Sequence, residues 1–207
     1  MIRRTPILLL WACLLLALST AVMARPSDDE ILQQVRTAAD QVLDRVLARR
    51  AELEAHPDRI HDSVSDIVVK YFDFTAMARS AMGKYWPRAS DEQRQAVVTE
   101  FTELLIRTYG TTALKYSGAP IRYDRVAWSK DDQRARVETT AEPEVGQPVR
   151  INYFLHSAEG RWQIYDVVVE DLSLVTNYRA SFSNEIRTSG VDGLIAKLRA
   201  RNEELGG

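Results

Sequence analysis

The side chains that could perform catalysis or bind a metal are few, and their spacing matches no motif with a known mechanism. His56 and His61 are five residues apart and do not share a helical face, His156 falls on an expected strand, and Cys13 is the only cysteine. The sequence lacks the G-x-S-x-G, G-x-G-x-x-G and G-x-x-x-x-G-K-[ST] patterns of hydrolases, dinucleotide-binding proteins and P-loop proteins. We therefore interpret the histidines as surface or partly buried residues and expect no metal site and no cofactor.

One enzymatic hypothesis uses Asp73 or Asp166 together with a tyrosine. A curved antiparallel sheet covered by helices can bury a carboxylate beside phenols and tune its pKa for use as a base. Asp73 is more simply explained as a helix cap, and Asp166 alternates with Tyr165 and Val167, which favours exposure to solvent. A small enzyme without a metal stays an alternative, but nothing in the sequence fixes a reacting geometry.

Aromatic and methionine side chains are concentrated between Tyr71 and Trp86, and further aromatic residues follow from Tyr109 to Phe182. Each of these residues alone is most simply explained as core. Together they are more large side chains than one interface between a sheet and helices readily fills. A cavity lined by some of them would suit a loosely shaped apolar ligand, because methionine and aromatic rings adapt to such ligands. If instead all of them belong to a solid core, the protein would be a non-catalytic adaptor.

The elements that must position these residues begin with helices. A capping box at residues 27–30 predicts a first helix to about Ala55, and a second, shorter helix follows from Asp58. Asp73 is placed to cap the next helix, and Gly83 permits its end. A second capping box at residues 90–93 predicts a long amphipathic helix up to Gly118.

Beyond Pro120 the apolar period changes from helical to alternating, which predicts strands. Four strands with short links indicate an antiparallel sheet, one face of which the helices must cover. The pattern places Val149, Ile151, Tyr153 and Leu155 on one face of their strand, and Tyr165, Val167 and Val169 on one face of the next. The helical period returns from Leu174 to Gly190 and again after Asp192, so the fold class is α+β. The expected strands are 121–129, 133–141, 149–157 and 162–170.

The N-terminus predicts export. Arg3 and Arg4 precede an apolar run at residues 7–18, and Val22 with Ala24 forms a signal-peptidase pattern, so we expect residues 1–24 to be a cleaved signal peptide. Residues 25–207 then form a single domain of ordinary size. The chain has 27 Lys and Arg against 29 Asp and Glu, and this balance argues against nucleic-acid binding, which requires a basic face.

Several segments together resemble a known family. They include FDFTAMA followed by GKYW, the helix start SDEQR, RTYG, and the carboxyl-terminal segments WQIYDVVVE, LSLVTNYR and GVDGL. In this order the motifs are similar to the periplasmic MlaC and toluene-tolerance Ttg2D family of phospholipid-binding proteins, over residues 29–201. The chain departs from the family at Asp171, where a glycine is usual, so the turn there is expected to differ.

The resemblance implies a monomeric periplasmic lipid carrier, not an enzyme, with phospholipid as its cargo. Its expected partners are an inner-membrane ABC transporter with a lipid-binding ring and an outer-membrane lipoprotein complex. A hopanoid is an alternative cargo, because one relative in the family is associated with hopanoid production. The lipid is expected to lie between the sheet and the helices, in contact with Phe74, Met77, Met82, Tyr85, Trp86, Leu105, Tyr109, Tyr153, Val167, Val169, Leu174 and Tyr178.

Overall fold

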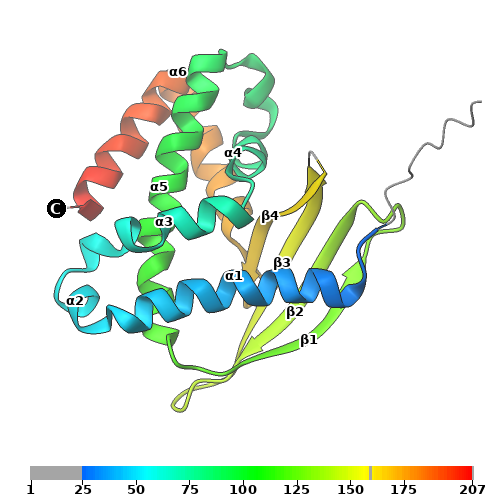
Figure 1. Cartoon of the computed structure of the whole chain (residues 1–207). Coiled ribbons are helices and arrows are strands. Elements are labelled where there is room, and N and C mark those ends of the chain that lie inside the picture. Colours follow the sequence, from blue (N-terminus) through cyan, green and yellow to red (C-terminus); the bar gives the residue numbers. More distant parts are fainter. Residues whose placement is uncertain (1–24, 159, 207) are drawn as a thin grey trace, which may run out of the picture.

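The computed structural model describes residues 25–158 and 160–206, and it shows one antiparallel sheet with helices against one face and one edge (Figure 1). The expected α+β class and antiparallel sheet are confirmed, with a short fifth strand added. The proposed signal peptide, residues 1–24, lies outside the described residues. The helices are α1 (Asp28–Ala48), α2 (Arg50–Ala55), α3 (Ile60–Tyr71), α4 (Phe74–Met82), α5 (Asp91–Tyr116) and α6 (Leu174–Gly206), with 3-10 turns η1 (Pro57–Arg59) and η2 (Gly83–Arg88). The strands, in spatial order, are β1 (Ile121–Trp128), β2 (Arg134–Ala141), β3 (Val149–Ala158), β4 (Arg161–Val169) and β5 (Leu172–Ser173).

The helix starts follow the predicted caps. The Ser27 hydroxyl accepts a hydrogen bond from the Glu30 amide at 3.2 Å, and the Glu30 carboxylate accepts one from the Ser27 amide at 2.7 Å. A second reciprocal pair of this kind joins residues 90 and 93 at the start of α5. The Asp73 carboxylate accepts from the Ala76 amide at 2.8 Å and caps α4, which ends where Gly83 adopts a φ of 53°. These caps satisfy amides that the first helical turn leaves unpaired.

The first helix is shorter than predicted. The expectation of one helix to about Ala55 is wrong, because the backbone leaves helical geometry at Arg49 (φ −113°, ψ 16°) and α2 begins immediately afterwards. The Arg49 guanidinium donates to the Ser63 hydroxyl at 2.6 Å and to the Glu52 carboxylate, and so ties this bend to α3. The predicted break at Gly190 is confirmed, since this residue interrupts α6 with a φ of 73°.

A bulge in β4 changes which side chains face the helices. Leu155 pairs with Ile164 but Phe154 pairs with Asp166, so the intervening residue of β4 has no partner on β3. The expected grouping of Tyr165 with Val167 and Val169 is therefore wrong. The Tyr165 ring instead packs against Phe154 and His156 on the opposite face, with ring centroids 6.4 and 5.1 Å apart.

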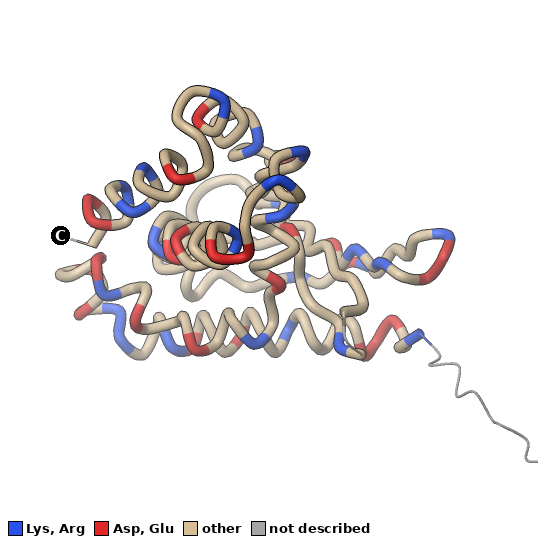
Figure 2. Tube along the Cα trace, turned by 90° about the horizontal axis from the view of Figure 1, so that it is seen from above, with Lys and Arg blue, Asp and Glu red and all other residues tan. Residues whose placement is uncertain are grey.

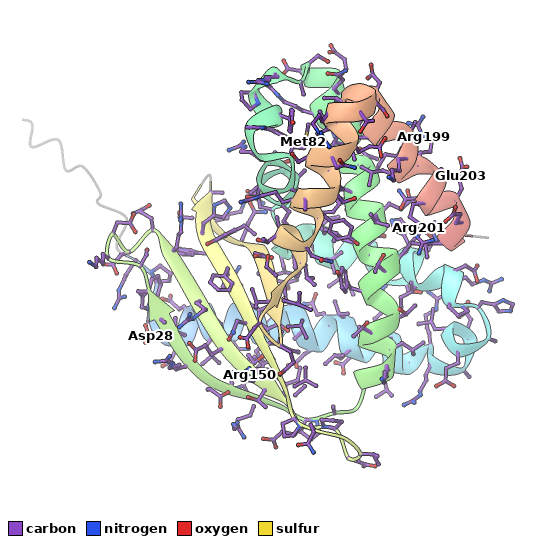
Figure 3. All side chains as sticks on the ribbon, turned by 180° about the vertical axis from the view of Figure 1, so that it is seen from behind. Asp28, Met82, Arg150, Arg199, Arg201 and Glu203 are labelled. Carbon is purple, nitrogen blue, oxygen red and sulfur yellow. The ribbon has the colours of Figure 1, made fainter. Side chains whose placement is uncertain are left out.

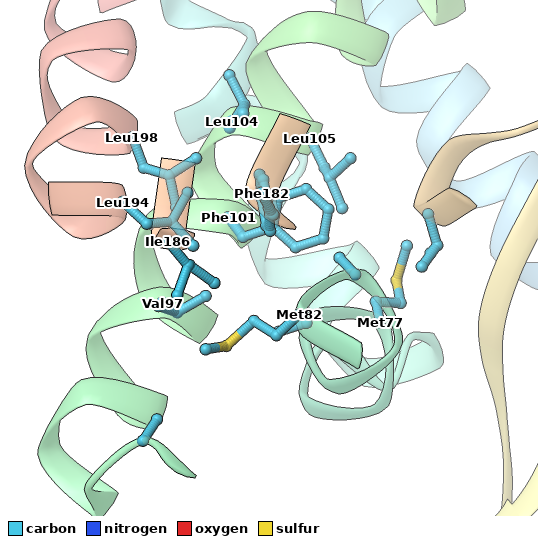
Figure 4. Close-up of a cluster of buried hydrophobic side chains, with 14 residues drawn as sticks. Met77, Met82, Val97, Phe101, Leu104, Leu105, Phe182, Ile186, Leu194 and Leu198 are labelled. Atoms are coloured by element: carbon cyan, nitrogen blue, oxygen red, sulfur yellow. The ribbon is translucent and has the colours of Figure 1, made fainter. Parts of the chain in front are cut away.

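The buried apolar residues form separate clusters. One lies between α4, α5 and α6 and contains Phe101 and Phe182 (Figure 4). The Phe101 ring meets those of Tyr178 and Phe182 edge-on, with ring centroids 5.1 and 5.0 Å apart. Another joins the inner face of the sheet to α1 through residues such as Val35 and Leu155. Lys and Arg are interspersed with Asp and Glu along the helices (Figure 2). The described surface therefore consists of mixed charges around apolar interfaces.

Candidate functional site

A cavity of about 260 Å³ lies between the inner face of the sheet and the helices α1, α3 and α5. Strands β1 to β4 contribute to its wall, and so do the linker before α4, α4 itself and the start of α6. Its lining residues are Ala38, Ala39, Val42, Leu43, Val64, Val68, Tyr71, Phe72, Phe74, Met77, Leu105, Ile106, Tyr109, Gly110, Thr112, Ala113, Ile121, Ala141, Ile151, Tyr153, Ile164, Val167, Val169 and Leu174. None of these lining residues carries a charge, so the cavity suits an apolar ligand.

Small side chains explain why this interface is not filled. Ala38 on α1 and Ala113 on α5 contribute to the cavity wall, and Ala141 lines it from β2. Gly110 also lines the cavity and allows close helix contact, because a Cβ atom there would lie 2.6 Å from Cγ1 of Ile60, so that the Ile60 side chain or the helices would have to shift. Close helix contact at Gly110 and short side chains beside it together leave room next to the sheet.

Eight of the twelve residues expected to contact lipid lie in the cavity wall, since the lining includes Phe74, Met77, Leu105, Tyr109, Tyr153, Val167, Val169 and Leu174. The structure places the other four elsewhere. Met82 is buried in the cluster between α4, α5 and α6, away from the strands (Figures 3 and 4). Tyr85, Trp86 and Tyr178 pack against that same cluster.

Sequence reasoning missed most of the wall supplied by α1 and α3, including Ala38, Val42, Val64 and Val68. It concentrated on large aromatic residues, whereas a cavity requires small or medium-sized side chains at facing positions. The alanine pair at residues 38–39, on the apolar face of the first helix, was a usable signal. Ile164 was missed for another reason, because the bulge in β4 turns it toward the helices.

Burial raises the pKa values of the two tyrosines in the cavity wall. It raises the pKa of Tyr109 to about 12, with a further upward contribution from the nearby Tyr178 phenol and an opposing hydrogen bond to Asn177. Burial also raises the pKa of Tyr153, and the neighbouring Tyr123 phenol adds to the effect. Both wall phenols are therefore neutral hydrogen-bonding groups at ordinary pH, which preserves the uncharged character of the cavity.

The two carboxylates of the enzymatic hypothesis are held by structural partners and do not line the cavity. Asp73 caps α4 and its second oxygen lies 2.9 Å from Nε2 of His156. The expectation that Asp166 faces solvent is wrong. Its carboxylate accepts hydrogen bonds from the Ser173 hydroxyl at 2.6 Å and from the Val175 amide at 3.3 Å. Burial raises the pKa of Asp166, and these hydrogen bonds oppose the rise. This arrangement anchors the start of α6.

A second hollow, of about 430 Å³, has the opposite chemistry. It lies between α5 and the end of α6, and charged residues such as Glu103, Arg107 and Arg199 line it. Within the described residues no cluster of three or more His, Cys, Asp or Glu side chains could hold a metal ion. No helix in residues 25–158 and 160–206 has both the length and the apolar character needed to cross a membrane.

Comparison with known proteins assigns the chain to a family. The family model described as MlaC protein matches residues 36–200, most of the chain. The chain belongs to the MlaC protein family. The resemblance inferred from the sequence motifs is thereby confirmed.

Two curated relatives of the MlaC family match over 180 residues, or 86% of this chain. The toluene tolerance protein ttg2D of Pseudomonas putida is 24% identical, and the match covers 82% of it. The intermembrane phospholipid transport system binding protein MlaC of Haemophilus influenzae is 22% identical, with 83% covered. A phospholipid-binding protein from Ralstonia solanacearum, solved in complex with a phospholipid, is 29% identical with a TM-score of 0.71, covering 85% of this chain and 98% of that one.

Proposed function

We propose that this protein is a lipid carrier that holds the acyl chains of a phospholipid in the cavity between the sheet and α1, α3 and α5. The single observation that carries the proposal is the uncharged, apolar lining of that cavity. Phe74, Met77 and Tyr153 are among the wall residues proposed to contact the chains. The solved phospholipid-bound protein with a TM-score of 0.71 supports the choice of ligand class.

The energetics of the cargo determine how it must be released. Two acyl chains carry on the order of 30 methylenes, and burying each contributes about 0.8 kcal/mol, so their transfer from water is worth roughly 24 kcal/mol before opposing costs. Spontaneous release into water would be correspondingly slow. The carrier must therefore deliver lipid by direct contact with a partner that offers another apolar site.

The proposed route lies in the periplasm, after removal of residues 1–24 as a signal peptide. The proposed partners are an inner-membrane ABC transporter with a lipid-binding ring and an outer-membrane lipoprotein complex. The name of the Haemophilus influenzae relative, an intermembrane phospholipid transport system binding protein, supports this route. Cell fractionation and N-terminal sequencing test it: the mature chain is expected in the periplasmic fraction, beginning at Arg25.

The cargo is tested by extracting the purified mature protein with organic solvent and analysing the extract by mass spectrometry. We expect phospholipid in near-stoichiometric amount, and uptake of phospholipid from liposomes by protein that has been stripped of lipid. Recovery of a hopanoid in place of phospholipid would change the cargo but keep the carrier. An extract without lipid, together with no uptake from liposomes, would contradict the proposal.

A further inference from the structure

The hydroxyl of Tyr123 is a buried polar group without a partner. Tyr123 lies on β1, two residues after Ile121, which lines the cavity, and therefore points to the same inner face of the sheet. Its hydroxyl oxygen is inaccessible to solvent and makes no hydrogen bond in the described structure. Leaving such a group unpaired is unfavourable, so its retention calls for an acceptor that the protein itself does not supply.

Tyr123 does not itself line the cavity, but the strand register places it in the same inward-facing row of the sheet as a residue that does. Tyr123 pairs with Thr139 on β2, which in turn pairs with Ile151 on β3, and Tyr153 occupies the next inward position along β3. Ile151 and Tyr153 both line the cavity. The Thr139 hydroxyl in the same row is satisfied, because it donates to the Ile151 carbonyl at 2.9 Å. The unpaired donor of this row is therefore the Tyr123 hydroxyl.

Charged residues of α1 flank the same position at the surface. The Arg36 guanidinium lies over the Tyr123 ring, 4.6 Å from its centroid. Asp40, one helical turn later, is also exposed. Burial raises the pKa of Tyr123 to about 12, with Asp40 raising it further and Arg36 lowering it, so both charges lie near the phenol. The position thus joins the apolar interior to a charged rim.

We propose that Tyr123 and Tyr153 form a polar subsite beside the cavity: a bound lipid displaces the side chains that close off the Tyr123 hydroxyl in this structure, and the hydroxyl then donates a hydrogen bond to an oxygen of the lipid. This inference rests on the proposed function and deepens it. The acceptor is an ester carbonyl or a phosphate oxygen of a phospholipid, both of which lie where the acyl chains join the head group. A ligand held at this point keeps its chains in the uncharged cavity, and its head group lies beside Arg36 at the surface.

The test compares Tyr123→Phe with wild type, using Tyr85→Phe as a matched control because Tyr85 packs outside the cavity. Binding of phosphatidylglycerol, diacylglycerol and hexadecane to the delipidated protein is measured by titration. The expected result is a fivefold to tenfold weaker affinity of Tyr123→Phe for phosphatidylglycerol, about the effect of one lost hydrogen bond, and unchanged affinity for hexadecane. Tyr85→Phe is expected to match wild type for all three probes.

Diacylglycerol distinguishes the two sources of the acceptor. An equal loss for diacylglycerol assigns the acceptor to the ester, and an unchanged affinity assigns it to the phosphate; either outcome supports the subsite. Unchanged binding of phosphatidylglycerol by Tyr123→Phe overturns the subsite and leaves the carrier proposal intact. An equal loss for hexadecane also overturns it, because it shows a deformed cavity. Failure of the wild type to bind phosphatidylglycerol alone overturns only the subsite, whereas failure to bind all three probes overturns the carrier and the subsite together.

Discussion

The cluster between α4, α5 and α6 and the interface between the sheet and α1 are both apolar. The cavity lies at the second, and only the edge of the cluster, at residues such as Met77 and Leu105, borders it. The cluster is filled by large side chains such as Phe101, which is 1% exposed, and Phe182, which is 2% exposed. The wall of the cavity has alanines at positions such as Ala38 and Ala113. The difference shows that the size of facing side chains, and not their polarity, separates a solid core from a ligand site.

The strongest test of this difference removes one large side chain from the interior of the cluster and one that borders the cavity. Phe101→Ala is expected to lower the free energy of unfolding by about 3–5 kcal/mol, because it leaves a new void in a packed cluster. Phe74→Ala should cost clearly less, because the Phe74 ring already borders a cavity and is only half-buried. Urea unfolding measures both variants. Equal losses would show that the cavity wall is packed as tightly as the cluster.

A matched pair of substitutions, each of which replaces an alanine with the larger leucine, sharpens the comparison. Ala38 lines the cavity and Ala78 lies in the cluster; both are buried in helices, at 6% and 0% exposure. Ala78→Leu should overpack the cluster and cost about 1–3 kcal/mol. Ala38→Leu should change stability by less than about 1 kcal/mol. It should also weaken phospholipid uptake about tenfold, because its side chain occupies space meant for the ligand.

Urea unfolding and a liposome uptake assay measure this pair. Full uptake by a stable Ala38→Leu variant would contradict the assignment of this cavity as the lipid site. A fully stable Ala78→Leu variant would show instead that the cluster contains unfilled space of its own. Either result would remove the contrast between the two regions.

The sequence predicted the elements better than the cavity they enclose. Both capping boxes, the Asp73 cap and the strand positions depend on local chemistry, which is read directly from adjacent residues. The bend at Arg49 is held by a hydrogen bond to Ser63. The Ile164 side chain faces the helices because β4 has a bulge opposite β3. These features arise between segments far apart in the chain, so the local pattern did not contain them.

The same reasoning explains which of the residues expected to contact lipid line the cavity and which do not. Val167 and Val169 follow the regular alternation of β4 beyond its bulge and reach the cavity as expected. Met82 and Trp86 belong to the right aromatic segment, but α4 and the following turn η2 direct them to the helical cluster. Helix orientation in three dimensions decides between these destinations, and composition alone does not.

A smaller effect is expected where the two regions meet. Asp73 caps α4, its backbone amide donates to the Ile164 carbonyl at 2.8 Å, and its side chain contacts His156. Asp73→Ala should cost about 1 kcal/mol for the lost cap, whereas Asp73→Asn retains a capping oxygen and should cost less. Denaturant unfolding of both variants measures this. A loss as large for Asp73→Asn as for Asp73→Ala would assign the effect to the contact with His156.

The smallest effect concerns Tyr109, which lines the cavity and hydrogen-bonds Tyr178 of the neighbouring cluster. Its pKa of about 12 in the folded protein exceeds the ordinary value of 10.0, so ionisation of the phenol favours the unfolded chain. Its contribution to stability is therefore complete below about pH 10 and is lost as the pH rises toward 12. The free energy of unfolding of Tyr109→Phe should therefore fall less steeply with pH in this window. Some pH dependence remains in this variant, because the pKa of Tyr123 is also raised to about 12.

Urea unfolding of the wild type and Tyr109→Phe at pH 9 and pH 11 measures this difference. An identical decline in the two proteins would show that the Tyr109 phenol ionises as freely in the folded protein as in the unfolded chain. Water would then reach the boundary between cluster and cavity, and the cavity would open at this side. A shallower decline in Tyr109→Phe supports a dry boundary, which an apolar cargo requires, because a bound acyl chain gains free energy only where it leaves water.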